Sequence, residues 1–472
     1  MNRLLPLLLG LAIAQVHAAK PNFVFILADD MGYGDLKAYN PDSKIPTPHL
    51  DQLSADGMTF TDAHSGGSTC KPSRYSLLTG RFAARKDQFA DNAGAIISSG
   101  RETVASQLRK NGYKTAMVGK WHLGFDKDNV DKRAGKGIQF NYDEPITGGP
   151  VDRGFDTYFG MHASLDIQPY FYIRGQKPTM PPTDTTDSND NVGGPEGWNH
   201  IQGAFWRAGN IAPDFKFEEV TPRFADEASQ VIENHCGSKP LFLYLALPSP
   251  HTPWVPTDEF KGKSGAGMYG DFTMLVDSVV GQIVASLEKA GMTDDTLLIF
   301  SSDNGPVWYE KDETRFGHKS VGSLRGCKAS VWEGGHRVPF IAKWPAQVKA
   351  GSRTDATIAF ADVLATIAEA AGQKKLTKGT AEDSVSFLPI LLNPCGNQPR
   401  PPLLHSGKVL RDGDWKLIDT KGSRGFNAPR GVQYGIELYN LRDDLSEQNN
   451  LAGKMPEKVS AMQGKLRQIL GD

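Results

Sequence analysis

Asn22-Phe-Val-Phe-Ile-Leu27 is a nearly unbroken apolar run, and Ala28, Asp29 and Asp30 follow it directly. A short run of β-branched and aromatic residues that is apolar on both faces is typical of a buried strand in a parallel sheet. Similar runs recur along the chain, and amphipathic segments of helical length separate them. This alternation predicts an α/β fold with a mixed, mostly parallel sheet flanked by helices.

The order of these segments predicts a large unit and a smaller one. Residues 175–210 are rich in Pro, Asp, Thr, Asn and Gly, so we expect a long surface excursion there. The alternation stops near residue 384, and we therefore expect a large α/β domain over 19–385 and a smaller C-terminal α+β subdomain over 386–472. The expected strands are 22–27, 113–118, 241–247, 296–301, 338–344, 408–410, 415–418 and 437–439, and the expected helices are 48–55, 103–110, 224–234, 272–290, 361–371 and 456–470.

Residues 1–18 have the pattern of a secretory signal peptide. Arg3 precedes an apolar run from Leu4 to Val16, and small residues follow it at Ala18 and Ala19. The apolar run is shorter than the roughly 20 residues that span a bilayer. We therefore predict a secreted or periplasmic protein whose mature chain begins near Ala19 and has no membrane span.

Charge and cysteine content exclude two classes of protein. The chain has 52 Lys and Arg against 54 Asp and Glu, a net charge of -2, whereas nucleic-acid-binding proteins usually carry an excess of basic residues. Nucleic acid is therefore not an expected partner. Only four cysteines occur in 472 residues, which excludes a small disulfide-dense scaffold.

Polar side chains follow four of the expected strands, at the point where each strand ends. In an open parallel sheet, ligands bind outside the carboxyl ends of the strands, so we expect these groups to converge. Carboxylate and amide oxygens suit Ca²⁺ or Mg²⁺ better than zinc, and nearby lysines and histidines suit a tetrahedral oxyanion. The pattern indicates sulfuryl or phosphoryl transfer. The residues are Asp29, Asp30, Lys120, Trp121, His122, His251, Asp303 and Asn304.

A cysteine motif supplies a candidate nucleophile. Residues 70–74 read Cys-Lys-Pro-Ser-Arg, and residues 75–81 continue Tyr-Ser-Leu-Leu-Thr-Gly-Arg. Cys70 would stand just before a helix that starts at Pro72, where backbone N–H groups favour negative charge. The spacing alone favours a buried or disulfide-bonded cysteine.

The motif itself resembles the signature of type I sulfatases in the alkaline phosphatase superfamily, C-x-P-S-R followed by S-L-L-T-G-R. The match is complete at those positions, and the resemblance extends over essentially the whole mature chain. It implies an alkaline-phosphatase-like fold and oxidation of Cys70 to formylglycine by a maturation enzyme. Other stretches similar to family motifs are 22–34, 119–124, 250–253, 302–305, 324–328, 333–339, 415–418 and 438–441.

The resemblance also implies a role for each matching residue. One Ca²⁺ would be bound by Asp29, Asp30, Asp303, Asn304 and the modified Cys70. Hydrated formylglycine would attack sulfur, with Arg74 and His122 holding or deprotonating the diol. Lys120 and Lys328 would bind sulfate oxygens, and His251 would protonate the departing alcohol. Ser164 matches a position where related enzymes place a sulfate-binding polar group.

Two positions depart from the family pattern. Cys327 replaces the usual glycine beside Lys328, and His336 stands where an apolar residue is common. We interpret Cys327 as a packing change or a site feature without choosing between them, and His336 as a candidate substrate contact at the edge of the site. If Cys70 is modified, at most one disulfide can form among Cys236, Cys327 and Cys395.

The leading hypothesis is a secreted, calcium-dependent, formylglycine sulfatase that hydrolyses sulfate esters. Export favours a sulfated carbohydrate as its substrate. Two alternatives stay open: a phosphodiesterase or phosphonate monoester hydrolase of the same superfamily, and a non-catalytic binder of sulfated glycans. The complete Cys70 motif together with Lys120 and Lys328 favours sulfate.

Overall fold

The computed structural model describes residues 20–471 except 86–93, 127–129, 132–138, 192–196, 199–200, 374, 397–398, 406–407, 422–423, 427, 429–431 and 433. The signal peptide predicted at 1–18 lies outside the described residues.

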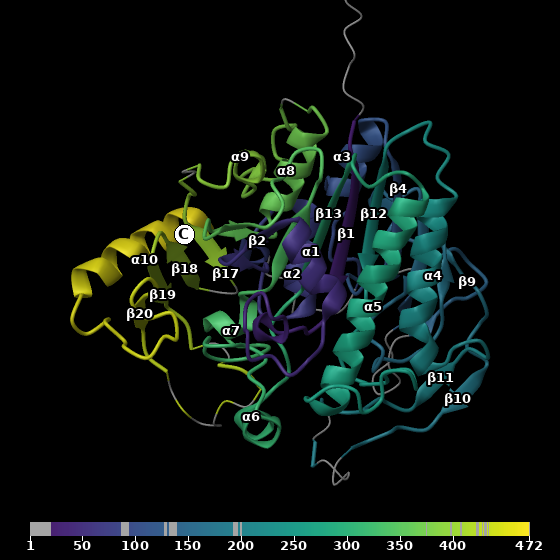
Figure 1. Ribbon diagram of the computed structural model, residues 1–472, viewed down its shortest axis with the longest axis horizontal. Helices are drawn as coiled ribbons and strands as arrows, with labels where there is room; N and C mark the ends of the chain where they lie inside the picture. Colours follow the sequence, from purple (N-terminus) through teal and green to yellow (C-terminus); the bar gives the residue numbers. More distant parts are fainter. Residues whose placement is uncertain are drawn as a thin grey trace, which may run out of the picture.

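A ten-stranded sheet forms the centre of the molecule, in the order β15-β2-β14-β13-β1-β12-β4-β7-β8-β9 (Figure 1). Its five central strands are mutually parallel: β13 (Thr296–Ser302), β1 (Asn22–Ala28), β12 (Leu241–Ala246), β4 (Lys114–Lys120) and β7 (Thr157–Met161). Antiparallel pairing begins outside them, at β14 (Phe340–Lys343) and β2 (Met58–Phe60) on one side and at β8 (Ile173–Arg174) and β9 (Lys177–Pro178) on the other. The outermost strand, β15 (Ser352–Thr354), is parallel to β2. The predicted mixed, mostly parallel sheet is confirmed.

Two groups of helices flank this sheet. The first comprises α1 (Pro48–Asp56), α4 (Val220–Glu233) and α5 (Gly267–Lys289), and Figure 1 shows α4 and α5 side by side in front of the strands. The second comprises α2 (Cys70–Thr79), α3 (Val104–Lys110) and α8 (Asp362–Ala370), which contact one another.

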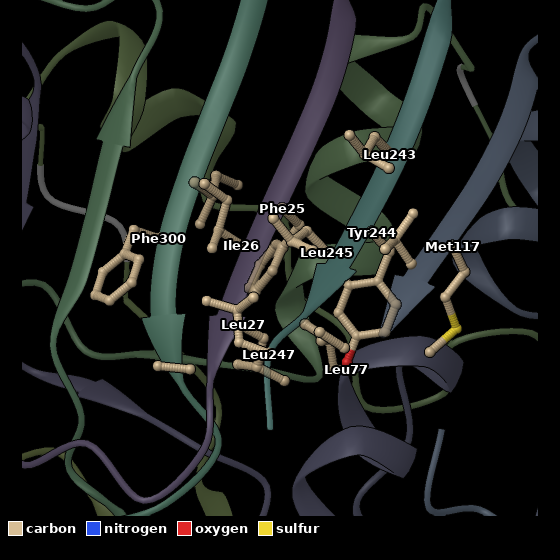
Figure 2. Close-up of a cluster of buried hydrophobic side chains, with 14 of the residues drawn as sticks. Phe25, Ile26, Leu27, Leu77, Met117, Leu243, Tyr244, Leu245, Leu247 and Phe300 are labelled. Carbon is tan, nitrogen blue, oxygen red and sulfur yellow. The ribbon is translucent and has the colours of Figure 1, made fainter. Parts of the chain in front are cut away.

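The core lies between the central strands and these helices. Ile26 and Leu27 of β1 have no exposed surface, and Phe25 meets Tyr244 of β12 edge to face with ring centroids 6.2 Å apart. Figure 2 shows these side chains in one apolar cluster with Leu77 of α2. Each large apolar side chain buried in this way contributes roughly 1.5–3 kcal/mol, which explains why an uninterrupted apolar run can form the central strand.

One helix in the described part of the chain is long and apolar enough to cross a membrane. It is α5, and 67% of its apolar stretch is buried inside the protein. The core helix of a folded domain meets the same length and composition criteria, so α5 is weak evidence for a membrane span.

A second, antiparallel sheet follows near the C-terminus. Its strands are β17 (Leu403–His405), β18 (Val409–Asp412), β19 (Trp415–Ile418) and β20 (Glu437–Asn440), and α10 (Pro456–Leu470) packs on them. Leu410, Leu417 and Leu438 form a small core with Met462 and Leu466 of the helix. The predicted small α+β unit is present, and its boundary at residue 385 stays a prediction.

Several local features differ from the sequence-based expectations. Helix α5 begins at Gly267, five residues before the predicted start at 272, because burial of Tyr269 against Trp254 and Trp308 outweighs the low helix propensity of the nearby glycines. The excursion at 175–210 contains β10 (Asp184–Thr186), which pairs with β11 (Gly209–Ile211). Helix α2 begins at Cys70 itself, so the cysteine is its first residue.

Strand β7 was not predicted, and its position depends on a close backbone approach. A Cβ atom on Gly160 would lie 1.9 Å from the carbonyl oxygen of Gly119 on the neighbouring strand β4. Any side chain at residue 160 would therefore push the two strands apart. Glycine here allows Lys120 and the loop after β7 to lie at the same edge of the sheet.

Candidate active site

The polar residues that follow the five parallel strands converge at one edge of the sheet. The backbone N–H of Asp30 donates to Asp303 Oδ1 (3.3 Å), and the N–H of Asp29 donates to the carbonyl of Ser249 (3.0 Å). The turns after β1, β12 and β13 are therefore joined by direct hydrogen bonds. Asp29, Asp303 and Asn304 have no exposed surface, and Asp30 is 2% exposed.

Helix α2 brings Cys70 and Arg74 to this edge. Thr69 is extended immediately before the helix, and Gly80 ends it in the left-handed conformation. Cys70 Sγ lies 3.4 Å from Asp29 Oδ1, and Arg74, one turn later, points the same way. Its guanidinium donates through Nε to Asp303 Oδ2 (3.0 Å) and through Nη1 to the carbonyl of Lys120 (3.1 Å), and Nη2 lies 2.8 Å from Asp303 Oδ2 as an ion-pair contact.

Two buried lysines reach the site from different segments of the chain. Lys120, at the end of β4, forms an ion pair with Asp29. Lys328 Nζ lies 2.6 Å from Asp30 Oδ1 and 3.7 Å from Cys70 Sγ. With Arg74, these lysines place three cations among three carboxylates around the cysteine, so a tetrahedral dianion would find donors on several sides.

The carboxylates influence one another's protonation. Burial alone would raise the pKa of Asp29, but Lys120 and the other nearby cations outweigh it and hold that pKa well below its usual range. Burial and the negative charge of Asp29 raise the pKa of Asp303. Asp29 and Asp303 therefore share the positive charges of Lys120 and Arg74.

These residues fit a hard divalent cation. Asn304 Oδ1 is buried and has no hydrogen-bond partner among the described residues, so this amide oxygen is free to act as a ligand. Asp29, Asp30, Cys70 and His251 each bring a possible ligand atom within 4.8 Å of the others. Oxygen donors dominate the combined set, which suits Ca²⁺ more than zinc.

Two histidines lie beside the cysteine and the carboxylates. His251 Nδ1 is 2.6 Å from the carbonyl of Thr252, a contact that directs its other nitrogen, Nε2, toward Asp30 Oδ2 (3.7 Å). His122 has a positive φ of 57°, and its Nδ1 is buried without a partner in the described part of the chain. Burial, together with Lys120, Lys71 and Arg74, keeps the pKa of His122 well below its usual value, so its ring is neutral.

The comparisons with known proteins agree with this geometry. A model of the sulfatase family matches residues 21–373, which include Cys70 and all the carboxylates and cations described above. The chain belongs to the sulfatase family. It is a sulfuric ester hydrolase with the fold of the alkaline phosphatase superfamily.

Individual relatives cover nearly the whole sulfatase. An N-acetylgalactosamine-6-O-sulfatase of Bacteroides thetaiotaomicron is 32% identical, with 99% of each chain covered. Human arylsulfatase G is 30% identical over 97% of this chain and 87% of its own. A solved structure of a "6S-sulf" protein, from work on glycosaminoglycan metabolism by Bacteroides thetaiotaomicron, is 30% identical with a TM-score of 0.83, covering 96% of this chain and 100% of that one.

The two predicted substrate contacts, Ser164 and His336, lie in different parts of the structure. Ser164 lies in the loop after β7, and its Oγ is buried without a partner among the described residues. His336, at the end of α7 (Glu333–His336), is only 2% exposed and contacts His64, His405 and Lys416. His336 thus packs against His405 of the C-terminal sheet, and its role as a substrate contact stays a prediction.

The described part of this sulfatase contains no disulfide. Cys70, Cys236, Cys327 and Cys395 all lie within it, and none of them forms a disulfide there. Cys327 is buried in a small apolar cluster with Val307 and Tyr309, which supports the packing interpretation of its departure from glycine.

The sequence analysis missed Asp166 and Arg207. Asp166 Oδ1 is buried without a hydrogen-bond partner in the described residues and lies 4.0 Å from His251 Nδ1, and Arg207 forms an ion pair with the other carboxylate oxygen. Arg207 belongs to the excursion at 175–210, where the sequence has no periodicity. The only available signal was that Asp166 follows Ser164 by two residues.

The buried histidine beside His122 predicts a dependence of stability on pH. Burial lowers the pKa of His162 to about 4. Between pH 6.5 and 4, His162 is therefore protonated in the unfolded chain and neutral in the folded chain. This group costs the native sulfatase up to about 3 kcal/mol between pH 6.5 and 4. We expect His162→Phe to reduce the loss of unfolding free energy between pH 7 and pH 4.5, measured by urea denaturation. Equal losses in wild type and His162→Phe would contradict the assignment.

Proposed function

We propose that the protein is a calcium-dependent sulfatase whose nucleophile is a formylglycine made from Cys70, and that it removes sulfate from a carbohydrate. The observation that carries this proposal is the position of Cys70. It lies at the start of α2 against Asp29 and Lys328, within a motif identical to the sulfatase signature. An ordinary buried thiol would not need three cations and three carboxylates around it.

The thiol itself is unsuited to nucleophilic attack. Burial and the charge of Asp29 raise the pKa of Cys70 far above its usual value, so the unmodified side chain carries no thiolate. This supports conversion by a maturation enzyme before catalysis. When present, the calcium ion and the hydrated aldehyde would supply an oriented hydroxyl next to a divalent charge.

Residues of the chain itself would bind the sulfate group, transfer the protons and hold the metal. Lys120 and Lys328 bind two sulfate oxygens and neutralise charge that develops on them. Arg74 holds Asp303 and stabilises the deprotonated nucleophile, and the neutral His122 accepts its proton. His251 donates a proton to the leaving alcohol. Asp29, Asp30, Asp303 and Asn304 would hold the metal.

The role of His251 predicts a dependence on the leaving group. A sugar alcohol is a poor leaving group and needs a proton, whereas a nitrophenolate leaves without one. We expect His251→Gln to lower kcat for sugar sulfates by about 10²–10⁴-fold and for 4-nitrophenyl sulfate by less than about tenfold. Steady-state kinetics on both substrates measures the difference, and equal losses would assign His251 to binding rather than to proton transfer.

Sulfated amino sugars are the proposed substrates. The relatives most similar over the full chain include an N-acetylgalactosamine-6-O-sulfatase and a structure from glycosaminoglycan metabolism, so 6-O-sulfated N-acetylgalactosamine is the first compound to test. We also propose that the protein is secreted or periplasmic, since residues 1–18 have the pattern of a signal peptide.

The test of the proposal compares substrate classes with the mature, calcium-loaded protein. Sulfate release from N-acetylgalactosamine 6-sulfate and its 4-sulfate isomer is measured beside hydrolysis of an aryl phosphate diester and an aryl phosphonate. We expect sulfate esters to be preferred by at least about 100-fold in kcat/KM, since both lysines would face sulfate oxygens. A preference for the diester or phosphonate would support the phosphohydrolase alternative. Binding of sulfated sugars without turnover, in a protein whose Cys70 is unmodified, would support the non-catalytic one.

A further inference from the structure

A second cluster of buried histidines lies outside the active site. His64 ends the short strand β3 (Ala63–His64), His336 ends α7, and His405 ends β17 of the C-terminal sheet. All three are at most 2% exposed, and the ring centroids of His336 and His405 are 3.9 Å apart. The cluster therefore joins the large unit of the protein to its C-terminal sheet.

The ring nitrogens have the spacing of metal ligands. His64 Nδ1 and His336 Nδ1 are 3.2 Å apart, and one nitrogen of each of the three rings lies within 4.8 Å of the others. Two imidazole nitrogens that bind one tetrahedral zinc at about 2.0–2.1 Å lie roughly 3.3 Å apart. The observed separation matches this value without movement of either ring.

The opposite nitrogen of His64 already has the partner that a metal-bound histidine needs, and that of His336 lies near both an acceptor carbonyl and the donor Lys416. His64 Nε2 is 2.8 Å from Asp62 Oδ1, and His336 Nε2 is 3.3 Å from the carbonyl of Val331. Histidines that bind a metal usually donate their second N–H to a carboxylate or a carbonyl, which fixes the ring. Both Nδ1 atoms are then left to face the centre of the cluster.

His405 is the strongest sign that a ligand belongs here. Both of its ring nitrogens are buried and have no hydrogen-bond partner among the described residues. Burial and the nearby His336, His64 and Lys416 keep the pKa of His405 well below its usual value, so the ring is neutral and carries a lone pair. A buried imidazole with two unpaired nitrogens is unfavourable unless something binds it.

The surrounding charges are balanced. Three carboxylates face three cations around the cluster, and Lys416 lies 2.9 Å from Glu333 Oε1 and 2.8 Å from Glu447 Oε1. Glu333 also offers an oxygen within 4.8 Å of ligand atoms of Asp62 and His64, and it is the nearest candidate for a fourth ligand. The charged groups that contact the histidines are Asp62, Glu333 and Lys416, and these in turn pair with Arg337, Arg411 and Glu447.

We propose that His64, His336 and His405 bind one divalent transition-metal ion of the zinc class, separate from the active-site cation, and that this ion ties the C-terminal sheet to β3 and α7 of the large unit. Imidazole ligands suit zinc and its neighbours, whereas calcium requires oxygen.

A hydrogen-bond chain without metal is the competing arrangement. Lys416 Nζ lies 3.1 Å from His336 Nε2 and can only donate. The proton of neutral His336 would then be on Nδ1, facing His64 Nδ1, and His64 would donate to Asp62. This series of hydrogen bonds gives partners to His64 and His336 but leaves both nitrogens of His405 without one among the described residues. A bound metal ion, in contrast, would contact all three rings.

The experiment uses the mature full-length protein in saturating Ca²⁺, after dialysis against a chelator that removes transition metals. Zn²⁺ is added, and bound zinc per chain is measured together with the melting temperature. We expect one zinc per chain and a rise in melting temperature in wild type and in Cys70→Ala. Co²⁺ in place of Zn²⁺ should give a ligand-field spectrum without thiolate charge transfer, because Cys70 takes no part.

His405→Phe is the decisive variant, because phenylalanine fills the same buried space and keeps the stacking on His336. Without metal we expect it to be at least as stable as wild type, since it removes two unpaired nitrogens, and we expect it to lose the zinc and the zinc-dependent rise. His49→Gln should behave as wild type. Absence of zinc from the wild-type protein, or equal zinc binding by His405→Phe, would overturn the proposal, whatever the outcome of the sulfatase assay.

Discussion

Replacing Cys70 by alanine is expected to abolish sulfate release, with a loss of at least about 10⁴-fold in kcat. The variant removes the nucleophile, but Lys120, Lys328 and His251 still surround the empty position and can still bind a sulfated sugar. The loss should therefore appear in kcat, while the dissociation constant for substrate stays within about tenfold of wild type. Initial-rate kinetics and calorimetric binding measure the two quantities separately.

The matched control for this prediction is Cys236→Ala. Cys236 is an exposed, free cysteine far along the chain, so its removal should change neither kcat nor binding. Mass spectrometry of the peptide that spans Cys70 should show conversion of the thiol to an aldehyde, a decrease of about 18 Da, in wild type and in Cys236→Ala. Sulfatase activity that survives in Cys70→Ala would refute the proposed nucleophile.

The central part of the fold could be predicted because each signal was local. The apolar run at 22–27 identified the central strand, and the polar residues after the strands marked the edge at which they converge. Asp29, Asp303 and Lys120 lie together because parallel strands end at one edge, which is a consequence of topology and not of sequence proximity.

The features that escaped prediction depend on long-range packing. Strand β7 needs the close approach of Gly160 to Gly119, and a glycine in an apolar run gives no hint of which strand lies beside it. Arg207 reaches Asp166 from a segment without periodicity. His336 was predicted as a substrate contact because it replaces an apolar residue of the family motif, and nothing in the sequence indicated that its ring stacks on His405 of β17.

Arg74→Met is expected to destabilise the protein strongly as well as to inactivate it. Arg74 has no exposed surface, and its guanidinium is the shared partner of Asp29 (3.3 Å) and Asp303. Removal of one partner from a buried ion pair leaves uncompensated charge and costs about 3–5 kcal/mol of unfolding free energy. Urea denaturation measures this loss. Arg81→Met, in the same motif but partly exposed and 4.0 Å from Glu382, should cost no more than about 1 kcal/mol.

The stability loss caused by Arg74→Met should depend on calcium, because the proposed ion and Arg74 neutralise the same carboxylates. The loss caused by Arg74→Met should therefore be smaller in saturating Ca²⁺ than after chelation, and the stabilisation by Ca²⁺ should be larger in the variant than in wild type. Arg74→Lys keeps the charge but loses the two-point contact with Asp303, so it should retain more stability than Arg74→Met while losing most of the activity. Losses that are identical with and without Ca²⁺ would mean that Asp29 and Asp303 do not bind the ion, and the metal site would then have to be sought elsewhere.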